Sequence, residues 1–224
     1  EGVNGESYTR TKWFNDIPAG NKYERNLKQE PKQVAQRKEI VEADVPLDAI
    51  FMTFHASARL DKGYHAMDLA SDLLSRGSSS RLYRNLVKEH ELFSEINAYV
   101  MGSIDPNLFI IEGKPSEGVS LEQAEEEIWK ELEILKTTLA SETELEKVKN
   151  KIESTNVFAE LSILDKAMNL AFFELLGDGN GLNTETEKYL AVKAEDIREQ
   201  AKEIFTKENS TILYYKAKEA VDAE

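Results

Sequence analysis

The sequence contains no cysteine, which excludes disulfide bonds, cysteine-ligated zinc and thiol nucleophiles together. Positive charge is also scarce, since 28 Lys and Arg residues stand against 42 Asp and Glu residues and give a net charge of −14. A field of that sign repels nucleic acid and anionic membranes, so neither is expected as a partner. No apolar run reaches the roughly 20 residues that span a bilayer, so no membrane insertion is expected.

The 224 residues that are present suffice for one large domain or two small ones with an ample core. The chain begins with Glu1 and helix-like residues instead of Met, and we interpret it as a fragment of a longer protein. Residues 6–16 are typical of the last turns of a helix, which Pro18 and Gly20 stop. We therefore expect residues 1–33 to be the end of an inter-domain helix and a linker, and residues 34–224 to be the main domain.

The first half of the chain alternates strands with helices. We predict strands over residues 37–45, 49–57, 94–102 and 107–113, and helices over residues 61–76 and 80–90. The strand at 49–57 is apolar enough to be buried on both faces. Residues 77–80, which we call the Gly/Ser loop, join the two helices. One of the serines in this loop should cap the second helix.

The second half of the chain is predicted to be mostly helical. Ser120 with Gln123 and Ser141 with Glu144 form two capping-box patterns, each of which begins a helix. The helix that starts at Ser141 should run to Leu176, because proline is absent and Gly177 ends it. Its second half is apolar on two sides and should be sandwiched between neighbours. Helices at 184–191 and 194–206 and a closing strand at 210–218 follow.

This order of elements predicts the α+β class. It corresponds to a decorated βαββαβ pattern, with a mainly antiparallel sheet of about five to six strands and helices packed on one face.

The residue types that do chemistry are poorly arranged in this sequence. His55, His65 and His90 lack the spacing that puts two imidazoles on one helical face. Glu89 and His90 match the end of an inverted zinc motif, but Leu86 stands where its first histidine must be. No metal site is therefore predicted in this chain.

The serines of the Gly/Ser loop have no histidine near them in sequence to act as a base. Helix capping accounts for them better than phosphate binding, because the Gly-Lys-Ser/Thr ending of a phosphate loop is missing. The paired carboxylates lie on polar helix faces and are typical of solvated surfaces. The residues alone do not make a complete active site.

An ordered set of segments nevertheless resembles the C-terminal domain of the M16 zinc metallopeptidases, the relatives of insulinase, pitrilysin and the mitochondrial processing peptidase. The segments are WFNDIPAG (13–20), EPKQVAQRKEIVEADVP (30–46), YHAMDLASDLLSRGSSSRLYRNLVKEHELFSEINAYV (64–100), DPNLFIIEGKP (105–115), ETELEKVKNKIESTNVF (142–158) and VKAEDIREQAKEIFTKENSTILYY (192–215). Together they cover nearly the whole chain. The resemblance implies the LuxS/MPP-like metallohydrolase fold.

The resemblance also implies that the peptidase has two domains with different roles. In such a peptidase a first domain binds zinc through His-x-x-Glu-His and a distal Glu, and the Glu of the motif is the general base. The second domain closes over an unfolded peptide substrate. We therefore expect no cofactor in this chain, zinc in an absent N-terminal domain, and that upstream zinc-binding domain as a partner.

Many members of the family carry an Arg and a Tyr that are seven residues apart in the motif R-E-x-x-G-L-A-Y. These two side chains stabilise the oxyanion that forms during catalysis. An ungapped alignment places the Arg position on Val87 and the Tyr position on Ser94, so both are lost. Lys88, Ser94 and Tyr99 remain as candidates for residues close to the substrate, and no catalytic residue is predicted.

Two functions are compatible with these losses. The parent protein is either a zinc endopeptidase whose Arg/Tyr pair lies on an M16 partner subunit, or a catalytically inactive scaffold subunit like the core proteins of respiratory complex III. We expect the first, with the periplasm or cell envelope as the compartment and the cytoplasm as the alternative.

Overall fold

A computed structural model describes residues 11–18, 20, 21, 28 and 30–218. The chain separates into two compact units, Glu1–Lys32 and Gln33–Glu224. In the first unit residues 11–14 are helical, while the earlier part of the predicted helix over 6–16 lies outside the described residues. The assignment of residues 1–33 to an inter-domain helix and linker stays a prediction.

The second unit is built on one five-stranded sheet. Its strands are β1 (Arg37–Ala43), β2 (Ala49–Ala56), β3 (Phe93–Val100), β4 (Asn107–Pro115) and β5 (Ser210–Ala217), in the order β1-β5-β2-β4-β3. The β1–β5 pair is parallel, and the other three pairs are antiparallel. The predicted mainly antiparallel sheet is confirmed.

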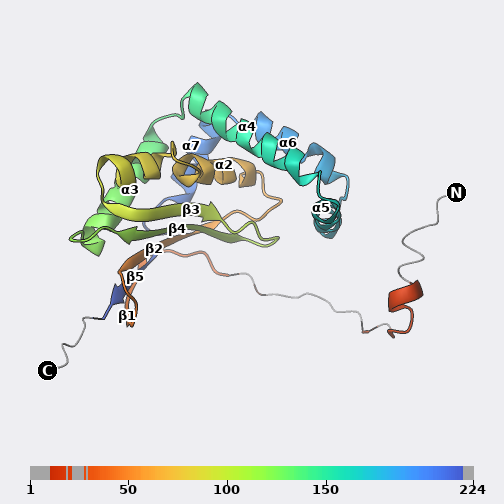
Figure 1. Cartoon of the computed structure of the whole chain (residues 1–224), viewed down its shortest axis with the longest axis horizontal. Helices are drawn as coiled ribbons and strands as arrows, with labels where there is room; N and C mark the ends of the chain where they lie inside the picture. The colour runs from red at the N-terminus through yellow and green to blue at the C-terminus, as the bar shows by residue number, and fades with distance from the viewer. Residues whose placement is uncertain (1–10, 19, 22–27, 29, 219–224) are drawn as a thin grey trace. The chain divides into compact units, whose positions relative to one another are not determined.

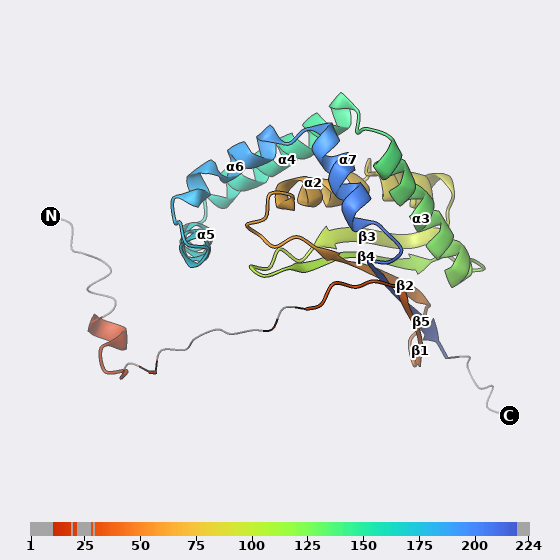
Figure 2. The same ribbon diagram turned by 180° about the vertical axis from the view of Figure 1, so that it is seen from behind.

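Seven helical segments accompany the sheet within the described part of this unit. They are α2 (Tyr64–Ser75), η1 (Tyr83–Glu89), α3 (Leu121–Thr137), α4 (Glu142–Ala159), α5 (Ile163–Leu175), α6 (Gly181–Ala191) and α7 (Ala194–Ile204). Figures 1 and 2 show α2, α3, α4, α6 and α7 on one side of the sheet, as the sequence predicts, and α5 beyond the ends of the strands. None of the described helices is long and apolar enough to cross a membrane.

The core lies between the sheet and the helices. On β2 the side chains of Ile50, Met52 and Phe54 are fully buried and face the helical layer. The alternate residues Phe51 and His55 are partly exposed on the opposite face. The prediction that this strand is buried on both faces was therefore wrong. The second face of β2 carries Ala49 and Phe51 but also Thr53 and His55, so it is only partly apolar.

The single helix predicted from Ser141 to Leu176 was also wrong, because α4 ends at Ala159 and α5 begins at Ile163. Ser162 caps the new helix, and its hydroxyl accepts a hydrogen bond from the Asp165 backbone N–H at 3.2 Å. A capping serine can thus start a helix where neither Pro nor Gly has ended the previous one. The apolar residues beyond the break are not sandwiched: Leu161, Ile163 and Leu164 are 76%, 89% and 70% exposed.

Candidate functional site

The junction between η1 and β3 contains Val87 and Ser94, the two positions to which the ungapped alignment assigns the family's Arg and Tyr. The element η1 is a π-helix. At its end the His90 N–H donates to the carbonyl of Asn85, five residues earlier, at 3.0 Å. Glu91 then adopts a φ of 53°, the one positive φ among the described non-glycine residues. In the ungapped alignment Glu91 takes the place of the motif's glycine, which is the residue that favours this conformation. The backbone here is therefore consistent with the ungapped alignment.

Val87 and Lys88 occupy neighbouring positions on η1 with different environments. Val87 is partly buried and packs against the hydrophobic core, so an apolar side chain suits this position. Lys88 is exposed, and its Nζ lies 5.8 Å from the centroid of the Tyr83 ring.

Ser94 and Tyr99 lie on β3. Ser94 occupies an irregularity in the β3–β4 pairing, between Phe93 and Glu95, and its hydroxyl donates to the Lys114 carbonyl at 3.2 Å. The Tyr99 hydroxyl donates to Glu112 at 3.3 Å. Burial and the nearby Glu112 carboxylate raise the pKa of Tyr99, so this phenol stays protonated at neutral pH.

No hydrogen bond within the described residues joins Lys88 to Ser94 or Tyr99. The structure thus does not bring these three candidates together as a polar constellation, and their proximity to a substrate stays a prediction.

A small pocket lies beside Ser94 on the sheet face that carries no helices. Its volume is about 130 Å³, and it is lined by Ala49, Phe51, Glu95, Asn97, Glu112, Gly113 and Lys114. The Lys114 ammonium donates to the Glu95 carboxylate at 2.9 Å and lowers the pKa of Glu95. The second carboxylate of the pocket, Glu112, accepts a hydrogen bond from Tyr99, so both carboxylates already have partners within the sheet.

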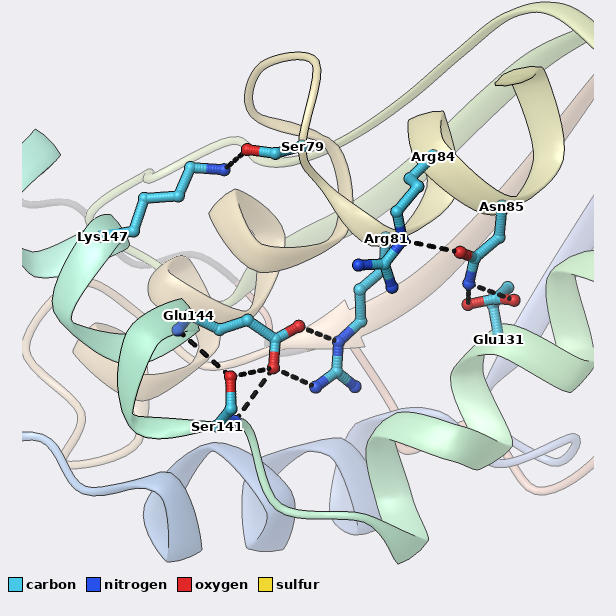
Figure 3. Close-up of polar contacts among 8 residues, drawn as sticks. All are labelled: Ser79, Arg81, Arg84, Asn85, Glu131, Ser141, Glu144 and Lys147. Atoms are coloured by element: carbon cyan, nitrogen blue, oxygen red, sulfur yellow. Dashed lines mark hydrogen bonds and ion pairs between the residues drawn. The ribbon is translucent and has the colours of Figure 1, made fainter. Parts of the chain in front are cut away.

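The Gly/Ser loop is clamped onto the helical layer by Arg81 (Figure 3). Its Nε and Nη2 donate to the two carboxylate oxygens of Glu144 at 2.8 and 3.0 Å. This hydrogen bonding lowers the pKa of Glu144 to about 2. Glu144 also completes the predicted capping box with Ser141 at the start of α4, which is confirmed. Arg81 therefore fixes the loop to the first turn of α4.

Two further contacts complete this clamp. Asn85 on η1 donates from its amide nitrogen to both carboxylate oxygens of Glu131 on α3, each at 2.9 Å. Ser80 is buried, and its hydroxyl donates to the Gly77 carbonyl at 2.7 Å. This serine closes the turn instead of capping the following helix, so the predicted cap is not formed by Ser80.

A buried ionic cluster under α6 was missed by sequence reasoning. Glu185 on α6 accepts hydrogen bonds from Arg59, just after β2, and from His65 on α2, the latter at 2.9 Å. Burial acts to raise the pKa of Glu185, but the hydrogen bonds from His65 and Arg59 outweigh it and lower that pKa to about 2. Next to it, the Tyr189 hydroxyl donates to Asp68 at 2.5 Å.

This cluster ties α6 to α2, and a structural role explains it fully. Arg59 and Glu185 lie 126 residues apart in sequence. No local spacing signal could have paired them.

The described residues contain no group of three or more His, Asp or Glu side chains that could hold a metal ion. His65 is engaged with the single carboxylate of Glu185. A zinc ion requires three or four such ligands converging on one point. The residues described do not fit the zinc that the resemblance associates with this kind of protein, and no chemical step through zinc is derived for them.

Comparison with known proteins explains why the described residues contain no set of zinc ligands. The family model of the peptidase M16 inactive domain matches residues 6–152. The chain belongs to the peptidase M16 inactive-domain family. The zinc protease PqqE of Helicobacter pylori is 29% identical to this M16 domain over 188 residues, which is 84% of the chain and 42% of that protein.

Solved structures resemble the same fold. A protease from Helicobacter pylori is 26% identical and superposes with a TM-score of 0.88 over 96% of this chain and 53% of its own. The peptidase M16 inactive domain from Pseudomonas fluorescens is 17% identical, with a TM-score of 0.69 over 88% of this chain and 46% of its own, and shows the fold alone. The chain thus spans about half the length of these relatives.

Proposed function

We propose that this M16 inactive domain is the non-catalytic half of a zinc metalloendopeptidase. In this role it encloses an unfolded peptide substrate and docks against a zinc-binding domain upstream in the same protein, or against an M16 partner subunit that carries the Arg/Tyr pair. The observation that carries the proposal is the family's fold together with the loss of both chemical side chains, since Val87 and Ser94 stand at their positions.

The helix-free face of the sheet supports a docking or enclosing role. Partly exposed apolar side chains from three adjacent strands lie side by side on it: Phe51 on β2, Leu108 and Ile110 on β4, and Leu213 and Tyr215 on β5. Contiguous apolar surface of this kind marks interaction sites on soluble proteins. An extended peptide or a neighbouring domain would cover these side chains and gain their burial energy.

A second apolar surface lies at the end of α4 and along α5. Its large exposed residues are Val157, Phe158, Leu161, Ile163, Leu164, Met168, Leu170 and Leu175. Leu164, Met168 and Leu175 recur at intervals of four and seven residues, so they form a stripe along one side of the helix. Such a stripe is typical of a helix that packs against another helix, and it supports docking against a second domain.

The chemical part of this role is limited to binding and exclusion of water. The hydroxyls of Ser94 and Tyr99 are both already hydrogen-bonded within the sheet. The general base and the metal-bound water must then be supplied by the other half.

Incubation of the purified chain with a denatured peptide, with and without added zinc, tests the proposal. We expect no hydrolysis in either case, because the chain supplies no metal site. Addition of a separately expressed zinc-bearing half should then produce hydrolysis that a chelator abolishes. Chelator-sensitive hydrolysis by the isolated chain would contradict the proposal.

The same reconstitution can be sharpened with matched variants. Leu164→Glu lies in the exposed α5 stripe, and Lys130→Glu lies on α3 away from it. If the stripe docks, Leu164→Glu weakens reconstitution and Lys130→Glu leaves it unchanged. Equal activity of the two variants would remove α5 from the docking surface.

The loss of both Arg and Tyr equivalents also favours a second candidate, a scaffold subunit without proteolytic activity. The two candidates differ in the residues that precede this domain in the whole protein. A His-x-x-Glu-His motif within the preceding roughly 200 residues, one typical domain, supports the peptidase, and its absence supports the scaffold.

A further inference from the structure

A polar groove separates the Gly/Ser loop from α4. It has a volume of about 670 Å³ and is lined by Asp72, Arg76, Gly77, Ser78, Ser79, Lys147, Val148, Asn150, Lys151 and Ser154. We call it the Ser-loop groove. Figure 3 shows Ser79 and Lys147 pointing toward one another across it, one from the loop and one from α4.

The charge of the Ser-loop groove is opposite to that of the whole chain. Three of its residues are cations, Arg76, Lys147 and Lys151, in a protein whose net charge is −14. Its one carboxylate, Asp72, is buried and accepts two hydrogen bonds from Arg76 Nη1, at 3.1 and 3.3 Å. Because Arg76 and Asp72 neutralise each other, the two lysines remain as the net charge of the groove.

The two lysines are not used in ion pairs. Lys147 donates to the hydroxyl of Ser79, and Lys151 makes no side-chain hydrogen bond or ion pair with the described residues. Four residues separate them on α4, so both ammonium groups project from the same side of the helix. Other lysines differ, since Lys130 and Lys136 on α3 each contact a carboxylate within 3 Å.

Neutral hydrogen-bond donors complete the lining. Ser78 and Ser79 contribute hydroxyls from the loop, and Asn150 and Ser154, again four residues apart, contribute an amide and a hydroxyl from α4. The packing of the loop does not require the first two serines, because Ser80 and Arg81 already hold the turn and the helix. Lys147 and Ser79 contact each other across the groove, while Ser78 and Lys151 make no side-chain hydrogen bond with the described residues.

We propose that the Ser-loop groove binds an oxyanion, a phosphate or a carboxylate, between Lys147 and Lys151 on α4 and the hydroxyls of Ser78 and Ser79 on the loop. Ammonium and hydroxyl donors are the partners that both anions share, and charge-assisted hydrogen bonds of this kind are among the stronger ones in proteins. This inference does not depend on the proposed role in peptidolysis.

Titration of the 224-residue chain, followed by amide chemical shifts, tests the inference. The probes are inorganic phosphate and acetate, each added at constant ionic strength against sodium chloride. We expect saturable shifts at residues 76–80 and 147–154 with at least one probe. Response to phosphate alone identifies a phosphate site, and response to acetate identifies a carboxylate site.

The variant Lys147→Ala/Lys151→Ala should weaken that binding by about tenfold or more, since it removes both charge-assisted donors. Lys130→Ala/Lys136→Ala, which removes the same charge from α3, should bind as the unaltered chain does. Circular dichroism of each variant checks the fold. Absence of saturable shifts in the groove with both probes, or equal weakening by the two double variants, would overturn the inference.

Discussion

The start of α4 and the segment from the end of α4 through α5 are both helical and both carry apolar residues, but the environments of those residues differ. At the start, Val148 and Ile152 are buried against the core, and Glu144 is held by Arg81. Beyond Ala159, the residues Ile163 and Leu164 face solvent. The first region is explained by packing inside this chain. The second is not explained by packing among the described residues, and under the proposed function it docks against a second domain.

The largest change in stability is expected from Arg81→Met, which removes the ion pair between Arg81 and Glu144 at the start of α4. The Glu144 carboxylate would lose two charge-assisted hydrogen bonds while remaining partly buried. We expect a loss of about 3 kcal/mol in the free energy of unfolding, measured by denaturant titration. Lys147→Met, one turn further along α4 in an exposed position, should change it by less than about 0.5 kcal/mol. Similar losses in the two variants would contradict the assigned role of Arg81.

The next largest change in stability is expected when an apolar side chain is truncated at the start of α4 but not when one is truncated in α5. Ile152→Ala removes buried methyl groups and should cost about 2 kcal/mol, because it leaves a cavity that the surroundings fill only in part. Leu164→Ala removes the same kind of group from an exposed position and should cost less than about 0.5 kcal/mol. Thermal and denaturant unfolding of both variants provides the measurement. A large loss in Leu164→Ala would show that α5 is covered within this chain.

A smaller effect is expected at the boundary between the regions. Ser162→Ala removes the side-chain cap of α5 and should destabilise that helix by about 1 kcal/mol. Because α5 is largely exposed, the loss should be local. Amide hydrogen exchange should become faster in residues 163–168 and stay unchanged at the start of α4. Unchanged exchange in α5 would mean that the hydroxyl of Ser162 contributes nothing to the helix start.

The sequence predicted the order of the elements along the chain and the helical face of the sheet, but not this division. The apolar run over residues 49–57 and the capping box at Ser141 are local signals, and the structure confirms the strand and the helix start that they indicate. The break before α5 has a local signal too, Ser162 followed by Asp165. This signal did not change the prediction of one continuous helix, because the residues on both sides of Ser162 favour helix.

The candidate site was less predictable for a different reason. The ungapped alignment assigns the family's Arg and Tyr positions to Val87 and Ser94, and these two residues lie at the junction of η1 and β3, where the backbone turns through Glu91. The ion pair of Arg59 and Glu185 depends on how α6 returns across α2, which no periodicity encodes. Long-range polar pairs of this kind are set by tertiary packing and stay outside the reach of a single sequence.

A further prediction concerns pH. The pKa of Glu144 is about 2 in the folded chain and 4.5 in its ordinary state. A carboxylate whose folded pKa is lowered stabilises the fold above its unfolded pKa, so this contribution is lost as the pH falls from about 4.5 to 2. The free energy of unfolding should fall in that window, and Glu144→Gln should flatten the slope. An identical slope in the variant would contradict the assignment.

The central claim is that the catalytic metal of the parent protein lies outside this chain. Its most direct test is the zinc content of the purified 224-residue chain after equilibration with zinc and removal of the unbound ion. The account predicts no stoichiometric zinc, because the described side chains offer no group of three ligands. One tightly held equivalent of zinc per chain would contradict it.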